Sequence, residues 1–156
     1  LYFAQMSPIY FRLKNDMIAH NLVLLYGGIL ITGIGFIIQA LADHQKNKAK
    51  QRNPKRFCDS GLYKIVRCPN YFGEILVWTG VFVSSVSCCN SLVESVIALA
   101  GYCGIVFVMF NGARRLEQRQ EVHYGNDEAY KHYAEHTPIL IPLLPLYSLK
   151  RWKFLG

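Results

Sequence analysis

Apolar residues in this chain are gathered into long runs rather than spread evenly. The run 22–42 contains no ionisable residue, and a helix of that length, rising about 1.5 Å per residue, matches a hydrocarbon core of roughly 30 Å. Two further uncharged runs, 75–93 and 95–113, are separated by Glu94 and predict a helical hairpin with its turn near residue 90. The pattern therefore predicts an all-α fold: an integral membrane helical bundle with about three transmembrane helices plus interfacial segments.

The alternative is a soluble bundle in which the same three helices are buried. Helices that are apolar on every side leave no polar face for water, which argues against that alternative. Composition agrees, because 52% of the residues are hydrophobic and 17% are charged, where soluble proteins average roughly 25% charged. Glycines in the runs are costly in soluble helices but allow close approach in membranes. They are Gly27, Gly28, Gly33, Gly35, Gly101 and Gly104.

The distribution of charge predicts an orientation. The chain carries 17 Lys+Arg against 10 Asp+Glu, with many of the basic residues in 43–74 and after residue 113. Because Lys and Arg accumulate on the cytoplasmic side of membrane spans, we expect 43–74 and 114–156 to lie on the cytoplasmic face of one membrane domain and to face a cofactor. Arg12 and Lys14 oppose this orientation. The membrane would be a bacterial inner membrane or the endoplasmic reticulum.

The excess positive charge also limits the expected partners. Basic segments beside membrane spans contact anionic lipid head groups or hold the phosphates of a cofactor. The sequence shows no recognisable nucleic-acid-binding motif, so no nucleic-acid partner is expected. The cysteines and histidines lack metal-ligand spacing, and we expect neither a metal site nor a disulfide framework.

The first cytoplasmic segment offers polar groups that suit a nucleotide. Asp43 and Lys46 share one face of a helix that continues from the first apolar run, as residues three apart do. They form either a solvated salt bridge of little energetic value or a pair that holds ribose and phosphates. Farther on, Pro69 restricts Cys68 to an extended conformation, and Asn70 lies where it can cap the next helix.

Glu74 immediately precedes an uncharged run. A carboxyl group at the membrane edge is costly to desolvate unless it is paired or protonated. Glu74 is therefore either an ordinary interfacial glutamate or a catalytic group that donates a hydrogen bond or a proton to a substrate carbonyl.

The second cytoplasmic segment follows the third run. Arg114 and Glu117 have helical spacing, so they either pair along a helix surface or contribute an arginine that clamps phosphates. Tyr130 and Tyr133 come next. The apolar segment 137–147 is too short and too rich in proline to span a membrane, so we expect it at the interface or across the base of the bundle.

These motifs together resemble a known family. The pattern comprises A-D-H-Q-K at 42–46, G-L-Y at 61–63, R-C-P-N-Y-F-G-E at 67–74 and Y-x-x-Y at 130–133 followed by I-P. Over about residues 36–142 the chain resembles the C-terminal catalytic region of the steroid 5-alpha-reductase family, including its bacterial relatives. The R-x-P-N-Y frame is shared with the isoprenylcysteine carboxyl methyltransferases, which use S-adenosylmethionine. Many relatives have a histidine at the position of Cys68.

The resemblance implies a membrane reductase that transfers hydride from NADPH to the β carbon of an enone in a steroid or other lipid substrate. It implies that Glu74 is catalytic and polarises the substrate carbonyl. The residues that it implies for cofactor binding are Asp43, Lys46, Arg67, Asn70, Tyr71, Arg114, Glu117, Tyr130 and Tyr133. The alternatives are an S-adenosylmethionine-dependent membrane methyltransferase and a non-catalytic membrane scaffold. Because the family usually has further spans before this region, the alternatives for this chain are a fragment, a minimal member that forms a homo-oligomer, or a relative that binds the cofactor without efficient turnover.

Overall fold

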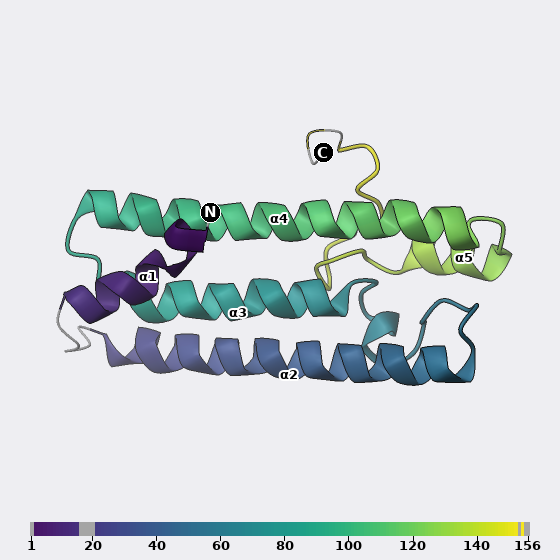
Figure 1. The fold of residues 1–156 in the computed structure, drawn as a ribbon, viewed down its shortest axis with the longest axis horizontal. Helices are drawn as coiled ribbons and strands as arrows, with labels where there is room; N and C mark the ends of the chain where they lie inside the picture. The colour runs from purple at the N-terminus through teal and green to yellow at the C-terminus, as the bar shows by residue number, and fades with distance from the viewer. Residues whose placement is uncertain (1, 16–20, 153, 155–156) are drawn as a thin grey trace. The chain divides into compact units, whose positions relative to one another are not determined.

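The computed structural model describes residues 2–15, 21–152 and 154, and every regular element among them is a helix (Figure 1). The predicted all-α fold is confirmed for these residues. The elements are α1 (Tyr2–Lys14), α2 (Leu22–Arg52), the 3-10 helix η1 (Gly61–Lys64), α3 (Pro69–Val86), α4 (Leu92–Tyr124) and α5 (Glu128–His136).

The chain forms two compact units. We call the first the apolar unit, which comprises Leu1–Phe36 and Glu74–Val108. The second, the polar unit, comprises Ile37–Gly73 and Met109–Gly156. Helices α2, α3 and α4 each contribute residues to both units.

In the apolar unit, α2 and α3 approach each other backbone to backbone. A Cβ atom added to Gly28 would lie 2.5 Å from the carbonyl oxygen of Gly80. One turn farther along α2, the Thr32 hydroxyl donates a hydrogen bond to the Val77 carbonyl at 3.3 Å. Small residues at a helix contact are typical of membrane bundles, because close packing replaces the hydrophobic effect that lipid does not supply.

Helices α2 and α4 direct most of their apolar side chains outward. In the most apolar window of each helix, only 11% of the α2 residues and 17% of the α4 residues are buried. Val23 is 80% exposed and Leu30 is 65% exposed. Soluble monomers rarely expose contiguous apolar surface of this extent. This exposure disfavours the soluble alternative. By length and composition, α2 and α4 are the described helices that could cross a membrane.

The second predicted run, 75–93, is only partly helical. Helix α3 ends at Val86 and α4 begins at Leu92. The carbonyls near the end of α3 are bonded by side chains from α1, since Arg12 donates to the Ser84 carbonyl. These bonds satisfy acceptors that a longer helix would have paired internally. Whether α3 crosses the membrane stays a prediction.

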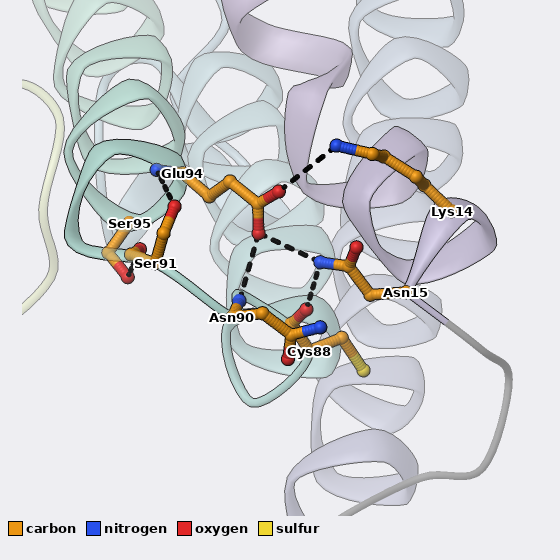
Figure 2. Close-up of polar contacts among 7 residues, drawn as sticks. All are labelled: Lys14, Asn15, Cys88, Asn90, Ser91, Glu94 and Ser95. Atoms are coloured by element: carbon orange, nitrogen blue, oxygen red, sulfur yellow. Dashed lines mark hydrogen bonds and ion pairs between the residues drawn. The ribbon is translucent and has the colours of Figure 1, made fainter.

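The turn between α3 and α4 is organised by Glu94 (Figure 2). Its backbone N–H donates to the Ser91 hydroxyl at 3.2 Å, which caps the first turn of α4. Its carboxylate accepts from the Asn90 backbone N–H at 2.9 Å and from the Asn15 amide at 2.8 Å. Lys14 completes the group with an ion pair at 3.5 Å. The predicted turn is confirmed, and Glu94 ties it to the end of α1.

In the polar unit, the residues just before α3 form backbone hydrogen bonds with the apolar segment 137–147. The backbone N–H groups of Arg67 and Cys68 donate to the carbonyls of Pro138 and Ile139 at 2.8 and 2.9 Å. Ile139 and its neighbour Leu140 are fully buried. Segment 137–147 therefore packs partly into the polar unit, and its pairing fixes the backbone of the R-C-P-N motif.

Candidate functional site

A buried ion pair lies at the centre of the polar unit. Arg67 Nη2 lies 3.2 Å from Glu117 Oε1, and the two side chains are only 2% and 3% exposed. The other carboxylate oxygen, Oε2, accepts from the Leu149 backbone N–H at 2.9 Å, and Arg67 also donates to the Tyr147 carbonyl. Buried charges need such additional hydrogen bonds to offset their desolvation. The structure thus brings together two of the predicted site residues, and they bond to each other.

Tyrosines and a phenylalanine surround this pair. Tyr130 is buried close to Arg67; burial raises the pKa of Tyr130, while the charge of Arg67 lowers it. The Tyr133 hydroxyl donates to the Tyr63 carbonyl at 2.7 Å, and its ring stacks on Phe57 with centroids 5.3 Å apart. Burial also raises the pKa of Tyr133. Both predicted tyrosines are therefore neutral phenols at physiological pH, and Tyr133 fastens α5 to the segment between α2 and α3.

A cavity of about 50 Å³ lies beside the ion pair and is lined by three predicted residues, Lys46, Arg67 and Asn70. An open groove of about 250 Å³ shares Lys46 with this cavity and adds Arg119 and His123. Cationic donors of this kind bind phosphate oxygens. The remaining residues that line the cavity are Lys50, Phe57, Cys58, Tyr63, Leu116, Gln120 and Tyr124.

The cations around the cavity differ in what they already bind. Arg67 is bonded to Glu117, and Lys50 donates to the Tyr124 hydroxyl at 2.7 Å and to backbone carbonyls beyond the end of α2. Lys46 is exposed, and among the described residues neither Lys46 nor the Arg119 side chain donates a hydrogen bond. Lys46 and Arg119 are therefore the cations best placed to meet an anion from solution.

Three predicted cofactor residues lie elsewhere in the polar unit. Asp43 is exposed on α2 and lines neither the cavity nor the groove. Tyr71 packs against α4, where a Cβ atom on Gly112 would lie 3.3 Å from its ring. Arg114 is buried on α4. Neither the cavity nor the groove contains Tyr71 or Arg114 among its lining residues.

Glu74 belongs to the apolar unit and is half-buried. The indole N–H of Trp78, one turn farther along α3, donates to Glu74 Oε1 at 2.8 Å. This bond orients the carboxyl group. The predicted catalytic residue thus bonds to Trp78, a neighbour that lies outside the R-C-P-N-Y-F-G-E motif at 67–74 and that the sequence analysis did not single out.

Sequence reasoning missed residues that shape the cavity. Lys50 lies in the basic segment for which the sequence predicts contact with lipid head groups or cofactor phosphates, and it bonds the Arg56 carbonyl at 2.7 Å. Lys50 lies in the last turn of α2, where basic side chains often bond backbone carbonyls near the helix end, and that position is the signal by which Lys50 was identifiable. Phe57 and Tyr124, whose ring centroids lie 5.9 Å apart, carried no such signal.

Cys68 is fully buried beside Arg67. Burial raises the pKa of its thiol to about 12, so the group is neutral at physiological pH. The position after Arg67 therefore holds a small uncharged side chain. In the part of the chain that the structure describes, no group of three or more metal-ligating side chains is found.

Comparison with known proteins assigns the family. The chain matches the family model described as "Protein of unknown function (DUF1295)" over residues 2–137. It is also 24% identical over 132 residues to the 3-oxo-5-alpha-steroid 4-dehydrogenase 1 of Rattus norvegicus, a match that covers 83% of this chain and 45% of the rat protein. The chain thus spans somewhat less than half the length of that relative. No solved structure matches the chain significantly. The chain belongs to the family described as DUF1295, and two of its described helices are long and apolar enough to cross a membrane.

Proposed function

We propose that this protein is a membrane reductase that uses NADPH to saturate the enone double bond of a steroid or another lipid. One observation carries the proposal: the similarity to the rat 3-oxo-steroid enzyme covers 83% of this chain. An oxidoreductase of steroid-reductase type is the coarser statement that this similarity supports. The cofactor, the substrate and the cytoplasmic position of the site are parts of the proposal.

The residues around the cavity fit part of such a cofactor. Lys46 and Arg119 offer cationic donors for phosphate oxygens, and Asn70 adds an amide. The groove of about 250 Å³ lies just below the roughly 300–1,000 Å³ of typical ligand pockets, so it suits the phosphate and ribose part of a dinucleotide. When bound, NADPH supplies the hydride. The Arg67–Glu117 pair acts as a positioning pair, because it joins the segment before Asn70 to α4.

Glu74 polarises the substrate carbonyl while the hydride is transferred. As hydride bonds to the β carbon, the electron pair of the carbon–carbon double bond moves toward the carbonyl oxygen. A protonated Glu74 donates a hydrogen bond to that oxygen and stabilises the charge that develops there. A proton from water then bonds to the α carbon, so one hydride and one proton have been added. Trp78 holds Glu74 in position through its indole N–H.

Ligand titration of the protein in nanodiscs tests the cofactor. NADPH should bind, and Lys46→Ala should weaken binding about tenfold, as expected for the loss of a charge-assisted contact. Lys48→Ala is the matched control, because Lys48 is also exposed on α2 but lines neither the cavity nor the groove. Binding of S-adenosylmethionine alone would replace the reductase proposal with the methyltransferase. Binding of neither molecule would favour the scaffold.

Turnover tests Glu74 separately. Glu74→Gln should reduce enone reduction by at least about 100-fold, because an amide is a much weaker hydrogen-bond donor than a carboxylic acid and one donor to a developing oxyanion contributes about that much, while the dissociation constant for NADPH stays unchanged. Glu135→Gln serves as the control, since Glu135 is exposed on α5 in the polar unit. Normal turnover in Glu74→Gln would remove this residue from the mechanism.

A further inference from the structure

The C-terminal segment is fastened along one face of α4. The Leu149 backbone N–H donates to Glu117 at 2.9 Å, and Leu149 itself is fully buried. The next residue, Lys150, forms an ion pair with Glu121. Glu117 and Glu121 are four residues apart and so lie on the same face of the helix. The residues that follow, Arg151 and Trp152, are therefore held next to α4.

Beyond these contacts the segment presents aromatic rings. The Trp152 ring stacks on Phe110 of α4, with centroids 6.2 Å apart and planes inclined by 6°. Phe154 stacks on Trp152 at 5.8 Å. Trp152 is 38% exposed and Phe154 is 70% exposed, so the contact with α4 leaves much of this aromatic surface uncovered.

The rings lie where the character of α4 changes. Phe110 belongs to the apolar run 95–113, and the charged part of the helix begins at Arg114. Because the hydrocarbon core ends where an uncharged run ends, Phe110 marks the boundary between lipid tails and head groups. Tryptophan concentrates at that depth, where its ring contacts lipid and its N–H reaches water.

The charged residues near the rings also favour a lipid bilayer as the partner of this surface. Arg151 adjoins Trp152 in the chain and is exposed, as is Arg115 on α4. Exposed cations next to interfacial aromatic rings attract anionic head groups. If the apolar run of α4 lies in a bilayer, the same bilayer also contacts the stacked rings. The surface formed by the rings is continuous with the apolar surface of α4, because Phe110 belongs to both.

We propose that Phe110, Trp152 and Phe154 form an interfacial anchor that holds the C-terminal segment in the head-group region of the lipid bilayer. The anchor fixes the depth of α4 through the stacked rings, and it fixes the segment that closes on the Arg67–Glu117 pair. The proposal rests on the membrane assignment of α4 and is independent of the proposed reductase activity.

Tryptophan fluorescence measures the depth directly, because the chain has two tryptophans. Trp78→Phe leaves Trp152 as the single emitter. The variant is reconstituted into vesicles of phosphatidylcholine and phosphatidylglycerol, with lipids brominated either near the head group or near the end of the acyl chain. We expect stronger quenching by the shallow bromines than by the deep bromines, a blue-shifted emission relative to the unfolded chain, and weak quenching by acrylamide from water.

Three results would overturn the anchor. Quenching by acrylamide without quenching by brominated lipid would place Trp152 in water. Stronger quenching by the deep bromines would place it in the hydrocarbon core. A blue-shifted emission that neither quencher reduces would indicate cover by protein, such as a second copy of the chain. If Trp78→Phe fails to fold, the difference between the wild-type chain and Trp152→Phe gives the same three readouts.

Discussion

The apolar and polar units are held together in different ways. In the apolar unit, Gly28 and Gly80 bring two helix backbones into contact, while α2 turns most of its apolar side chains outward. In the polar unit, a buried ion pair of Arg67 and Glu117 lies among aromatic rings and backbone hydrogen bonds. In lipid the hydrophobic effect does not drive helices together, so close packing has to stabilise the helix contacts of the apolar unit. The comparison predicts that the apolar unit is most sensitive to added volume and the polar unit to lost charge.

The largest effect is expected from removing one charge of the buried pair. Glu117→Gln leaves the Arg67 guanidinium uncompensated, and breaking a buried pair in this way costs about 3–5 kcal/mol of unfolding free energy. Hydrogen exchange should show the loss in peptides of the polar unit, while peptides of 22–36 and 92–108 stay protected.

Glu121→Gln is the matched control, because its ion pair with Lys150 is exposed. An exposed pair contributes about 0–1 kcal/mol. Equal losses for Glu117→Gln and Glu121→Gln would contradict the account of the polar unit.

Added volume should have the next largest effect, and in the apolar unit. Gly28→Ala places a Cβ atom 2.5 Å from the Gly80 carbonyl oxygen, and such overpacking costs about 1–3 kcal/mol. Gly27→Ala is the control, because a Cβ atom there meets nothing within 4 Å. Unfolding in mixed micelles measures both variants. If Gly27→Ala were the more damaging change, the two helices would not pack through Gly28.

A smaller effect is expected from alkaline pH in the polar unit. The folded chain raises the pKa of the Cys68 thiol to about 12 through burial, from about 8.5 for an unfolded thiol. The resulting stability is present below the unfolded pKa and is lost as pH rises above it. Cys68→Ala should reduce the alkaline slope of the unfolding free energy, and an unchanged slope would show that Cys68 is not its source.

The mildest test labels thiols without changing stability. At neutral pH an alkylating reagent should modify Cys58, which lines the cavity and is partly exposed, much faster than the buried Cys68. NADPH should slow the labelling of Cys58, as peptide mass spectrometry would show. Equal labelling of the two cysteines would mean that the polar unit is open at Cys68.

Sequence reasoning predicted the elements better than it predicted their partners. The uncharged runs located α2 and α4, because membrane length and hydropathy are properties of one segment. The same reasoning extended the second run to residue 93, whereas α3 ends at Val86. Near that end, Arg12 of α1 donates to the Ser84 carbonyl, and Asn15, just after α1, donates to the Cys88 carbonyl. A pattern within the run does not show such distant donors.

The candidate site shows the same limit. Arg67 and Glu117 were each selected as cofactor ligands, but neither motif shows that the two side chains bond to each other. Asp43 was selected by its spacing from Lys46, yet only Lys46 lines the cavity. Spacing places residues on one helix face, and it leaves open which part of that face a distant segment covers. The roles of these residues toward NADPH stay predictions.

Transfer of deuterium tests the central claim most directly. Wild-type protein in nanodiscs is incubated with NADPH deuterated at nicotinamide C4 and with a 3-oxo steroid that has a 4,5 double bond, and the product is analysed by mass spectrometry. The account predicts a saturated ketone with one deuterium at the β carbon, formed by the wild-type chain and by Glu135→Gln but not by Glu74→Gln. A chain that binds NADPH yet transfers no deuterium to that enone or to other lipid enones would contradict it.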